Sequence, residues 1–256
     1  MSNEDIISTV KKDYINDLAD EGKRVDARAM DQYRNISIET GWAENAEGSA
    51  LVKLGNTQVL AGVKVGKGTP YPDKPDQGVL MTNVELAPMA HASFESGPPG
   101  EEATELARVV DRGIRESEMI ELEKLCIEPE EEIWMVYVDI HIMDHDGNLI
   151  DASALASVAA LLTAEAPDDE DWELSGFPVT KKPITTTFAK VGNTLMVDPC
   201  LEEENVMGAR FTIATLEDGS ICAMQKGGSA PLKKEDFLKA EEWAKVKSKE
   251  LRKKLE

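Results

Sequence analysis

Apolar and polar residues recur along this chain with two periods, one typical of helices and one typical of strands. Residues 4–19 carry apolar side chains at near-helical spacing, which predicts a leading helix within residues 1–21. Residues 34–39 alternate between polar and apolar side chains, which predicts a strand. Residues 233–256 are charged with an imperfect apolar stripe, which predicts a C-terminal helix. The 256 residues therefore suit one large α/β domain or two smaller ones.

A short motif occurs twice. Residues 48–66, GSALVKLGNTQVLAGVKVG, predict a β-hairpin that turns at Gly55 and Asn56. Residues 190–194 repeat the same Lys-[Leu/Val]-Gly-Asn-Thr pattern, and an acidic segment at residues 165–174 separates the two regions. The repeat favours an internally duplicated fold. The alternative is coincidence, since Gly-Asn hairpins are common.

Residues 136–161 read as strand, tight turn and helix. Because a helix N-terminus presents unpaired N–H groups and the positive end of its dipole, this layout often binds phosphate. Here the turn offers Gly147 but continues with Asn148, Leu149 and Ile150, and the helix opens on Asp151. We expect the Asp151 carboxylate to cap the N–H groups and to repel phosphate. The segment has the layout of a phosphate site with unsuitable side chains.

Charge and composition narrow the classes of partner. The chain has 28 Lys and Arg against 49 Asp and Glu, a net charge of −21. Freestanding nucleic-acid binders are usually basic, so any RNA contact must come from a local cluster or a basic partner. The alternative is that acidity serves solubility alone. No apolar run reaches the roughly 20 residues of a membrane span, the N-terminus lacks signal-peptide character, and the three cysteines form no CxxC pair, which together favour a cytoplasmic protein.

Three of only eight arginines, Arg108, Arg112 and Arg115, are spaced to lie on one helix face. Apolar residues at 106, 109, 110 and 114 fall on the opposite side. Guanidinium groups match phosphate geometry, so this face is a candidate RNA-binding surface. The alternative is a solvated face whose arginines pair with glutamates at 101, 105 and 116.

Other candidate chemistry is weaker. His141 and His145 share a predicted strand with Asp139, but four strand residues span about 13 Å, which is too far for one metal ion. Asp198 and Glu204 could form a catalytic carboxylate pair, although such a segment is more often a solvated turn. We find no nucleotide-binding, hydrolase or zinc motif, and expect neither a metal nor a cofactor.

Several segments together resemble the RNase PH family. Residues 22–34, GKRVDARAMDQYR, resemble its GxRxDxR opening, and the hairpin at residues 48–63 is similar to its second motif. The segments ELARVVDRGIR, YVDIHIMDHDGN and the one around Asp198 follow in the family's order. The resemblance runs from about residue 22 to 228. It is strongest to the non-catalytic RNase PH-like ring subunits of archaeal exosomes.

The resemblance implies an α/β (α+β) fold of two βαβ-like halves, with mixed sheets packed on central helices, in a single domain over residues 1–256. Active members cleave RNA from its 3′ end with inorganic phosphate, held by a Gly-Gly-Thr-Arg turn. Those positions match Gly147, Asn148, Leu149 and Ile150, of which only the first is kept. Two family aspartates match Asp198 and Glu204, which leaves a vestigial pair. A chain so altered is expected to be inactive by itself.

The resemblance also implies partners: a catalytic RNase PH-like paralogue in a hetero-hexameric ring (a trimer of heterodimers), RNA-binding cap subunits and RNA, with no membrane. Arg112 and Arg115 lie nearest the family's arginine positions. Two other functions stay open, an active phosphate-dependent exoribonuclease or RNA-tailing enzyme using Asp198 and Glu204, and a purely architectural subunit. Glu130 stands where relatives usually have glycine, so we expect a strained positive φ there.

Overall fold

The computed structural model describes residues 3–255, and side chains from residue 11 onward. The helices are α1 (Asn3–Asp20), α2 (Glu101–Glu116), η1 (Leu122–Leu125, a 3-10 turn), α3 (Leu149–Leu162), α4 (Leu201–Glu204) and α5 (Lys234–Arg252). The strands are β1 (Ile36–Thr40), β2 (Gly48–Leu54), β3 (Thr57–Gly68), β4 (Val79–Leu86), β5 (Cys126–Glu128), β6 (Glu132–Asp144), β7 (Ile184–Val191), β8 (Thr194–Val197), β9 (Ala209–Thr215) and β10 (Ile221–Gly227).

The strands form two sheets. The first has the order β1-β2-β3-β6-β4, with β5 also paired to β6, and the second has the order β10-β9-β7-β8. In the first sheet β4 runs parallel to β6 and α2 connects them, which makes a βαβ unit. The second sheet is antiparallel in all its pairs, with α4 inserted between β8 and β9. The mixed α/β fold predicted above is confirmed.

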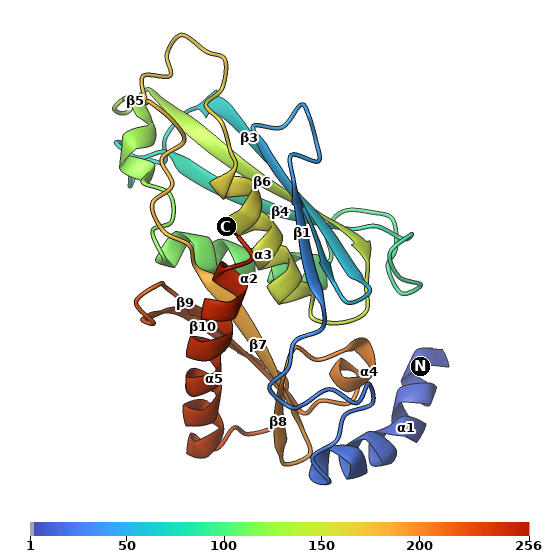
Figure 1. The fold of residues 1–256 in the computed structure, drawn as a ribbon. Coiled ribbons are helices and arrows are strands. Elements are labelled where there is room, and N and C mark those ends of the chain that lie inside the picture. Colours follow the sequence, from blue (N-terminus) through green and yellow to red (C-terminus); the bar gives the residue numbers. More distant parts are fainter. Residues whose placement is uncertain (1–2, 256) are drawn as a thin grey trace.

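Helix α3 is the central element, and it lies between the two sheets (Figure 1). It packs on β2 and β3 of the first sheet, on β7 of the second, and on α2. All residues from Leu149 to Leu161 are buried, and most are alanine or leucine, so the helix is apolar around its whole circumference. This burial fixes the position of its N-terminus. Whether residues 1–256 form a single domain stays a prediction.

The repeated motif forms a hairpin in each sheet. Leu54 pairs with Thr57 at the end of the first hairpin, and Val191 pairs with Thr194 at the end of the second. Gly55 and Gly192 both have φ near +60°, which glycine adopts without strain. Both hairpins predicted from the sequence are therefore present with the same two-residue turn.

The terminal helices lie close to their predicted positions, with differences in detail. In α1 the inward side chains are Ile15 and Ala19, whereas Tyr14, which the periodicity placed on the apolar face, is exposed. Helix α5 ends at Arg252, before the predicted limit of 256. The first two residues and the last lie outside the described chain. Glu130 has φ +70°, as expected for a position that favours glycine.

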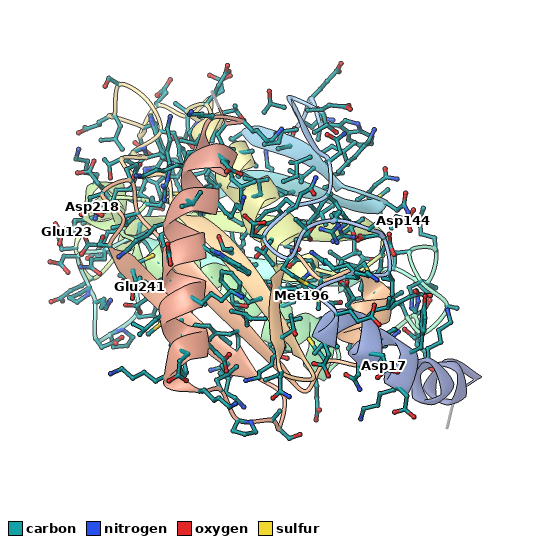
Figure 2. The ribbon with its side chains drawn as sticks, turned by 60° about the horizontal axis from the view of Figure 1, so that its bottom comes forward. Asp17, Glu123, Asp144, Met196, Asp218 and Glu241 are labelled. Carbon is teal, nitrogen blue, oxygen red and sulfur yellow. The ribbon has the colours of Figure 1, made fainter. Side chains whose placement is uncertain are left out.

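Charged side chains cover the outside of the molecule. Figure 2 shows Asp17, Glu123 and Asp218 at its periphery, whereas Met196 lies towards the middle of the view and is buried. Within residues 3–255, none of the helices has both the length and the apolar character that crossing a bilayer requires.

Candidate phosphate turn and arginine face

The turn after β6 supplies the N-cap residue of α3, the helix that follows it. Asn148 is the N-cap of α3, with left-handed φ and ψ of +53° and +48°, and its Oδ1 accepts a hydrogen bond from the Asp151 N–H at 3.4 Å. The expectation that Asp151 caps the helix is therefore wrong. Asparagine tolerates this backbone conformation and has a shorter reach to the first turn, so it takes the capping position.

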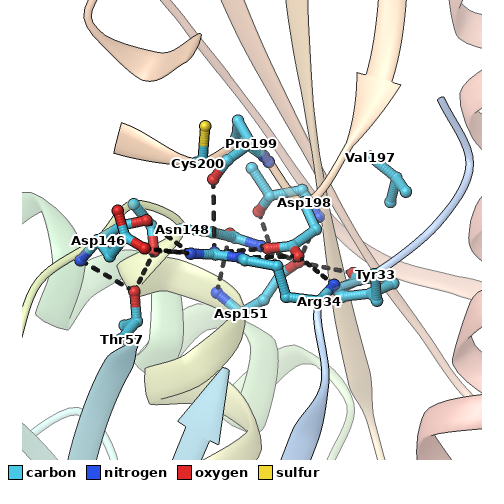
Figure 3. A network of polar contacts seen from close by, with 12 residues as sticks. Tyr33, Arg34, Thr57, Asp146, Asn148, Asp151, Val197, Asp198, Pro199 and Cys200 are labelled. Atoms are coloured by element: carbon cyan, nitrogen blue, oxygen red, sulfur yellow. Dashed lines mark hydrogen bonds and ion pairs between the residues drawn. The ribbon is translucent and has the colours of Figure 1, made fainter. Parts of the chain in front are cut away.

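Asp151 instead connects α3 to the second sheet and to the N-terminal segment. Its carboxylate accepts hydrogen bonds from the Tyr33 hydroxyl at 2.6 Å and from the Thr187 N–H and hydroxyl at 2.9 and 2.7 Å. The Asn148 amide donates a further bond at 2.9 Å (Figure 3). Burial raises the pKa of Asp151 to about 6, against these hydrogen bonds, which lower it. The Asp151 carboxylate therefore connects α3 to β7 of the second sheet and to the N-terminal segment that contains Tyr33.

Gly147 is required by packing. Its φ is +89°, and a Cβ there would lie 2.5 Å from the backbone of Cys200 and Leu201. The Thr57 hydroxyl donates to the Gly147 carbonyl at 2.7 Å. Only glycine fits this close approach, so its retention in the turn needs no bound phosphate.

The two turn positions after Asn148 are apolar and buried. Leu149 and Ile150 are only 7% and 6% exposed and belong to the main hydrophobic core. Their side chains contribute no hydrogen-bond donor where a phosphate-binding turn would need one. These two positions are therefore part of the hydrophobic core.

Asp198 is fully buried and its carboxylate is saturated with donors. Arg28 donates at 2.8 Å and the Arg34 guanidinium donates at 2.8 and 3.0 Å. The Asn148 amide donates at 2.8 Å, and the Arg34 backbone N–H adds a fifth bond at 2.8 Å (Figure 3). Burial would raise the pKa of Asp198, but the hydrogen bonds and charges of Arg34 and Arg28 hold it below its usual value. This carboxylate is charged and enclosed.

The arginines of the GKRVDAR opening were assigned no role from the sequence, and they form the support of the site. Arg24 donates two bonds to the Glu203 carboxylate, at 2.9 and 2.5 Å, and two more to the carbonyls of Val197 and Asp198. Both charged side chains are at most 1% exposed. The sequence offers no local signal for this pairing, because the two partners lie 179 residues apart.

Glu204 differs from Asp198. It is the last residue of α4, it is partly buried, and its Oε1 accepts a hydrogen bond from the Asn148 N–H at 2.9 Å. Burial raises its pKa to about 7, although the Asn148 hydrogen bond and the charges of Arg210 and Arg34 oppose this. Asp198 and Glu204 therefore both contact Asn148, the first through its side-chain amide and the second through its backbone N–H.

The predicted arginine face is present on α2. Arg108, Arg112 and Arg115 are exposed, while the residues predicted to lie opposite them are buried: Leu106, Val109, Val110 and Ile114. Arg112 donates to the Gln225 side chain on β10 at 2.8 Å. Arg115 is bound to both carboxylate oxygens of Asp111 and to the Leu80 carbonyl, each at 2.9 Å.

Arg108 has no hydrogen bond or ion pair among the described side chains, so its guanidinium is available. Arg108 and Arg112 line an open groove of about 570 Å³ between α2 and β10, together with Gln225. Glu105, considered above as a partner for these three arginines, pairs instead with Arg210 at 2.6 Å. The three arginines thus share a face but differ in freedom.

Two of the three histidines, His91 and His145, pack together, whereas His141 has a different partner. His145 follows the end of β6, accepts from the Gly147 N–H and packs on His91 and Phe94, with ring centroids 5.2 and 5.5 Å away. His141 pairs with Glu85 at 3.1 Å on the surface. Across residues 3–255, no group of three or more potential ligands is arranged to hold a metal ion.

Comparison with known proteins places this geometry in a family. Residues 32–167 match the sequence model of domain 1 of the 3′ exoribonuclease family, and residues 182–247 match domain 2. An exosome complex component Rrp42 from Methanothermobacter thermautotrophicus is 52% identical, over 92% of this chain and 90% of the relative. Another from Thermococcus gammatolerans is 50% identical, over 99% and 96%.

Among solved structures, an Archaeoglobus fulgidus exosome chain, from a complex with RNA bound to the active site, superposes with a TM-score of 0.93. It is 45% identical, over 98% of this chain and all of that chain. Sequence, fold and turn geometry agree with the resemblance to the RNase PH family. The chain therefore belongs to the 3′ exoribonuclease family of RNase PH-like proteins.

Proposed function

We propose that this chain is a non-catalytic, RNA-binding ring subunit of an archaeal exosome, where it supports 3′-to-5′ phosphorolytic RNA degradation by a catalytic paralogue. Its relatives carry the name of an exosome component, and the similar solved structure is an exosome with RNA. The observation that carries the proposal is that protein groups hold both site carboxylates, Asp198 and Glu204.

The turn lacks the means to hold phosphate for chemistry. An acid or base must reach the reacting proton, but Asp198 is enclosed by arginine and asparagine donors. The side chains of Leu149 and Ile150 supply no hydrogen-bond donor to a phosphate, and the loss of one such donor weakens oxyanion stabilisation by about 3–4 kcal/mol. These facts favour an inactive chain over the rival in which Asp198 and Glu204 catalyse.

RNA contact is best supported in the groove between α2 and β10. Among the described side chains Arg108 is unpaired, and Gln225 holds Arg112 at the groove, so both can meet a phosphate backbone. With a net charge of −21, the chain as a whole repels RNA, which makes such a local cationic surface necessary. Arg115 is proposed to contribute charge from its more restrained position.

The proposed partners follow the same reasoning. A catalytic paralogue would supply the intact phosphate site within a hetero-hexameric ring, a trimer of heterodimers, and RNA-binding cap subunits would deliver RNA to it. We propose that the ring acts in the cytoplasm and that the chain enters it as a single domain. A partner more basic than this chain would complement its acidity.

The first test is activity of the isolated chain. Incubated with RNA and inorganic phosphate, it should release no nucleoside diphosphates, whereas the ring reconstituted with the catalytic paralogue should release them. Release by the purified chain alone, at a rate comparable to the ring, would contradict the non-catalytic assignment and support the rival enzyme.

The second test addresses RNA binding in the reconstituted ring. The double variant Arg108→Glu/Arg112→Glu should lower RNA affinity by about tenfold or more and flatten its salt dependence by roughly 1.4, because each lost phosphate contact on single strands removes about 0.7. Lys234→Glu/Lys249→Glu on α5 makes the same charge change at exposed sites and is the control. Equal affinities of both variants would leave an architectural role alone.

A further inference from the structure

Glu105 places a negative charge on the wall of the groove between α2 and β10. The charged residues of that wall are two of each sign: Glu101, Glu105, Arg108 and Arg112. Because these charges cancel, the wall by itself has no net positive charge to attract RNA phosphates. Residues three apart on a helix are neighbours, so a free Glu105 carboxylate would lie within reach of Arg108. The proposed RNA-binding surface therefore requires Glu105 to be neutralised.

Arg210, on β9 of the second sheet, neutralises Glu105. Its Nη2 donates to Oε1 of Glu105 at 2.6 Å, a contact between residues 105 apart in sequence. The Arg210 side chain is 19% exposed and that of Glu105 is 48% exposed, so the guanidinium is the more enclosed of the two groups. No hydrogen bond or ion pair joins Glu105 to Arg108 in the part of the chain that the structure describes. The carboxylate thus has a partner outside its own helix.

Strand β10 leaves room for the Arg210 guanidinium beside α2. Arg210 pairs with Gly227 in the antiparallel register of β9 and β10, and α2 packs against β10. A Cβ at Gly227 would lie only 3.2 Å from Nη2 of Arg210 and 3.5 Å from its Cζ. A glycine in a strand permits such a close approach. Gln225, two residues earlier on the same strand, accepts the hydrogen bond of Arg112. The second sheet therefore contacts the charged face of α2 at two points.

We propose that Arg210 is a positioning residue for RNA binding, which neutralises Glu105 so that Arg108 stays free to meet phosphate. With Glu105 paired, the two arginines of the groove exceed its remaining carboxylate, Glu101, by one charge. Without Arg210, Glu105 would pair with Arg108 one helical turn away and would repel an approaching phosphate. This role rests on the proposed RNA-binding function, and it belongs to a residue outside the three arginines of α2.

The test measures RNA affinity and its salt dependence in the reconstituted ring, with a short oligouridylate as the probe. Arg210→Gln should lower the affinity about threefold to fivefold and reduce the salt slope by up to about 0.7, because one phosphate contact is lost. Adding Glu105→Gln should restore the wild-type affinity, since the carboxylate that Arg210 neutralised is then absent. Lys249→Gln makes the same charge change at an exposed site in the last turn of α5, and this control should leave the affinity unchanged.

The rescue by Glu105→Gln separates this role from other roles of Arg210. If Arg210 contacted RNA itself, or acted through Glu204, which lines a cavity with it, Glu105→Gln would not restore the affinity and the proposal would be overturned. Unchanged affinity in Arg210→Gln would also overturn it. Arg210→Met keeps the aliphatic stem of the side chain and replaces Arg210→Gln should that variant fold poorly, with the same expected loss and the same rescue.

The variant Arg108→Glu/Arg112→Glu, measured in the same ring, distinguishes failure of this inference from failure of the proposed function. If that variant leaves RNA affinity unchanged, the groove between α2 and β10 is not the RNA-binding surface. If it lowers the affinity whereas Arg210→Gln does not, only the positioning role of Arg210 is wrong.

Discussion

Two groups of three arginines, alike in chemistry, have opposite environments in this molecule. Arg24 and its two neighbours in the opening, Arg28 and Arg34, have side chains at most 10% exposed and are bound to Glu203 or Asp198. The three arginines of α2 are exposed and meet no buried carboxylate. The difference teaches that the acidic partner decides the role: arginine facing a buried acid becomes structure, and arginine facing solvent stays available for ligands.

The same comparison gives Asp198 a structural role that does not depend on catalysis. Asp198 accepts bonds from Arg28, Arg34 and Asn148, so it ties the N-terminal segment to the start of α3. Removing it would leave two arginines buried without their anion. Asp198 is therefore needed for the packing of this region whether or not the chain is an enzyme.

The largest expected effect comes from breaking the buried group. Arg24→Ala leaves the Glu203 carboxylate buried and unpaired, which should lower the free energy of unfolding by about 3–5 kcal/mol. Arg108→Ala should change the free energy of unfolding by less than about 0.5 kcal/mol, because Arg108 is exposed and has no partner in the described part of the chain. Urea unfolding followed by circular dichroism measures both. Similar destabilisation in the two variants would mean that the groups do not differ.

An effect of intermediate size should appear in the pH dependence of the unfolding free energy, through the carboxyl group of Glu204. The folded pKa of Glu204, about 7, lies above its ordinary value of 4.5, so the folded state binds an extra proton between these values. Stability therefore falls as pH rises from about 4.5 to 7. One pKa unit corresponds to about 1.4 kcal/mol, and partial exposure reduces the expected loss to about 1–2 kcal/mol.

Glu204→Gln should remove that part of the slope in unfolding free energy measured at pH 5, 6, 7 and 8. Asp151, whose pKa is raised in the same direction to about 6, should leave a smaller residual slope. Arg112→Ala is the control, because Arg112 is exposed and bonds to Gln225 instead of either carboxylate, so the slope should not change. A slope identical in the wild type and in Glu204→Gln would show that Glu204 titrates normally.

Local pattern was sufficient to predict much of this fold. The hairpins at Gly55 and Gly192 and the amphipathic helix bearing the α2 arginines depend on neighbours in sequence, and the structure contains them. The arginine roles themselves stay predictions. Family resemblance identified residues 147–150 as a candidate phosphate turn. Periodicity alone described this region only as strand, turn and helix.

The contacts that could not be predicted from the sequence involve partners that are distant along the chain. Asp151 was expected to cap its own helix, but Tyr33 and Thr187, distant in sequence, offer it stronger donors than the first turn does. The Arg24–Glu203 pair joins residues 179 apart, and no local pattern signals such a pair. Polar side chains in a buried layer choose partners across elements, so their roles require the packed structure.

The smallest expected effect separates members of the exposed group from one another. Arg115 forms an ion pair with Asp111 one helical turn away and also binds the Leu80 carbonyl, so Arg115→Ala should lower the free energy of unfolding by about 0.5 kcal/mol. Arg108→Ala should leave stability unchanged. For RNA affinity of the reconstituted ring the order should reverse, because Arg108 is free to meet phosphate, whereas Arg115 must first give up existing bonds. If Arg115→Ala weakened RNA binding more than Arg108→Ala, the intramolecular bonds of Arg115 would be holding its guanidinium in place for RNA, and freedom would be the wrong criterion for ranking the arginines of this face.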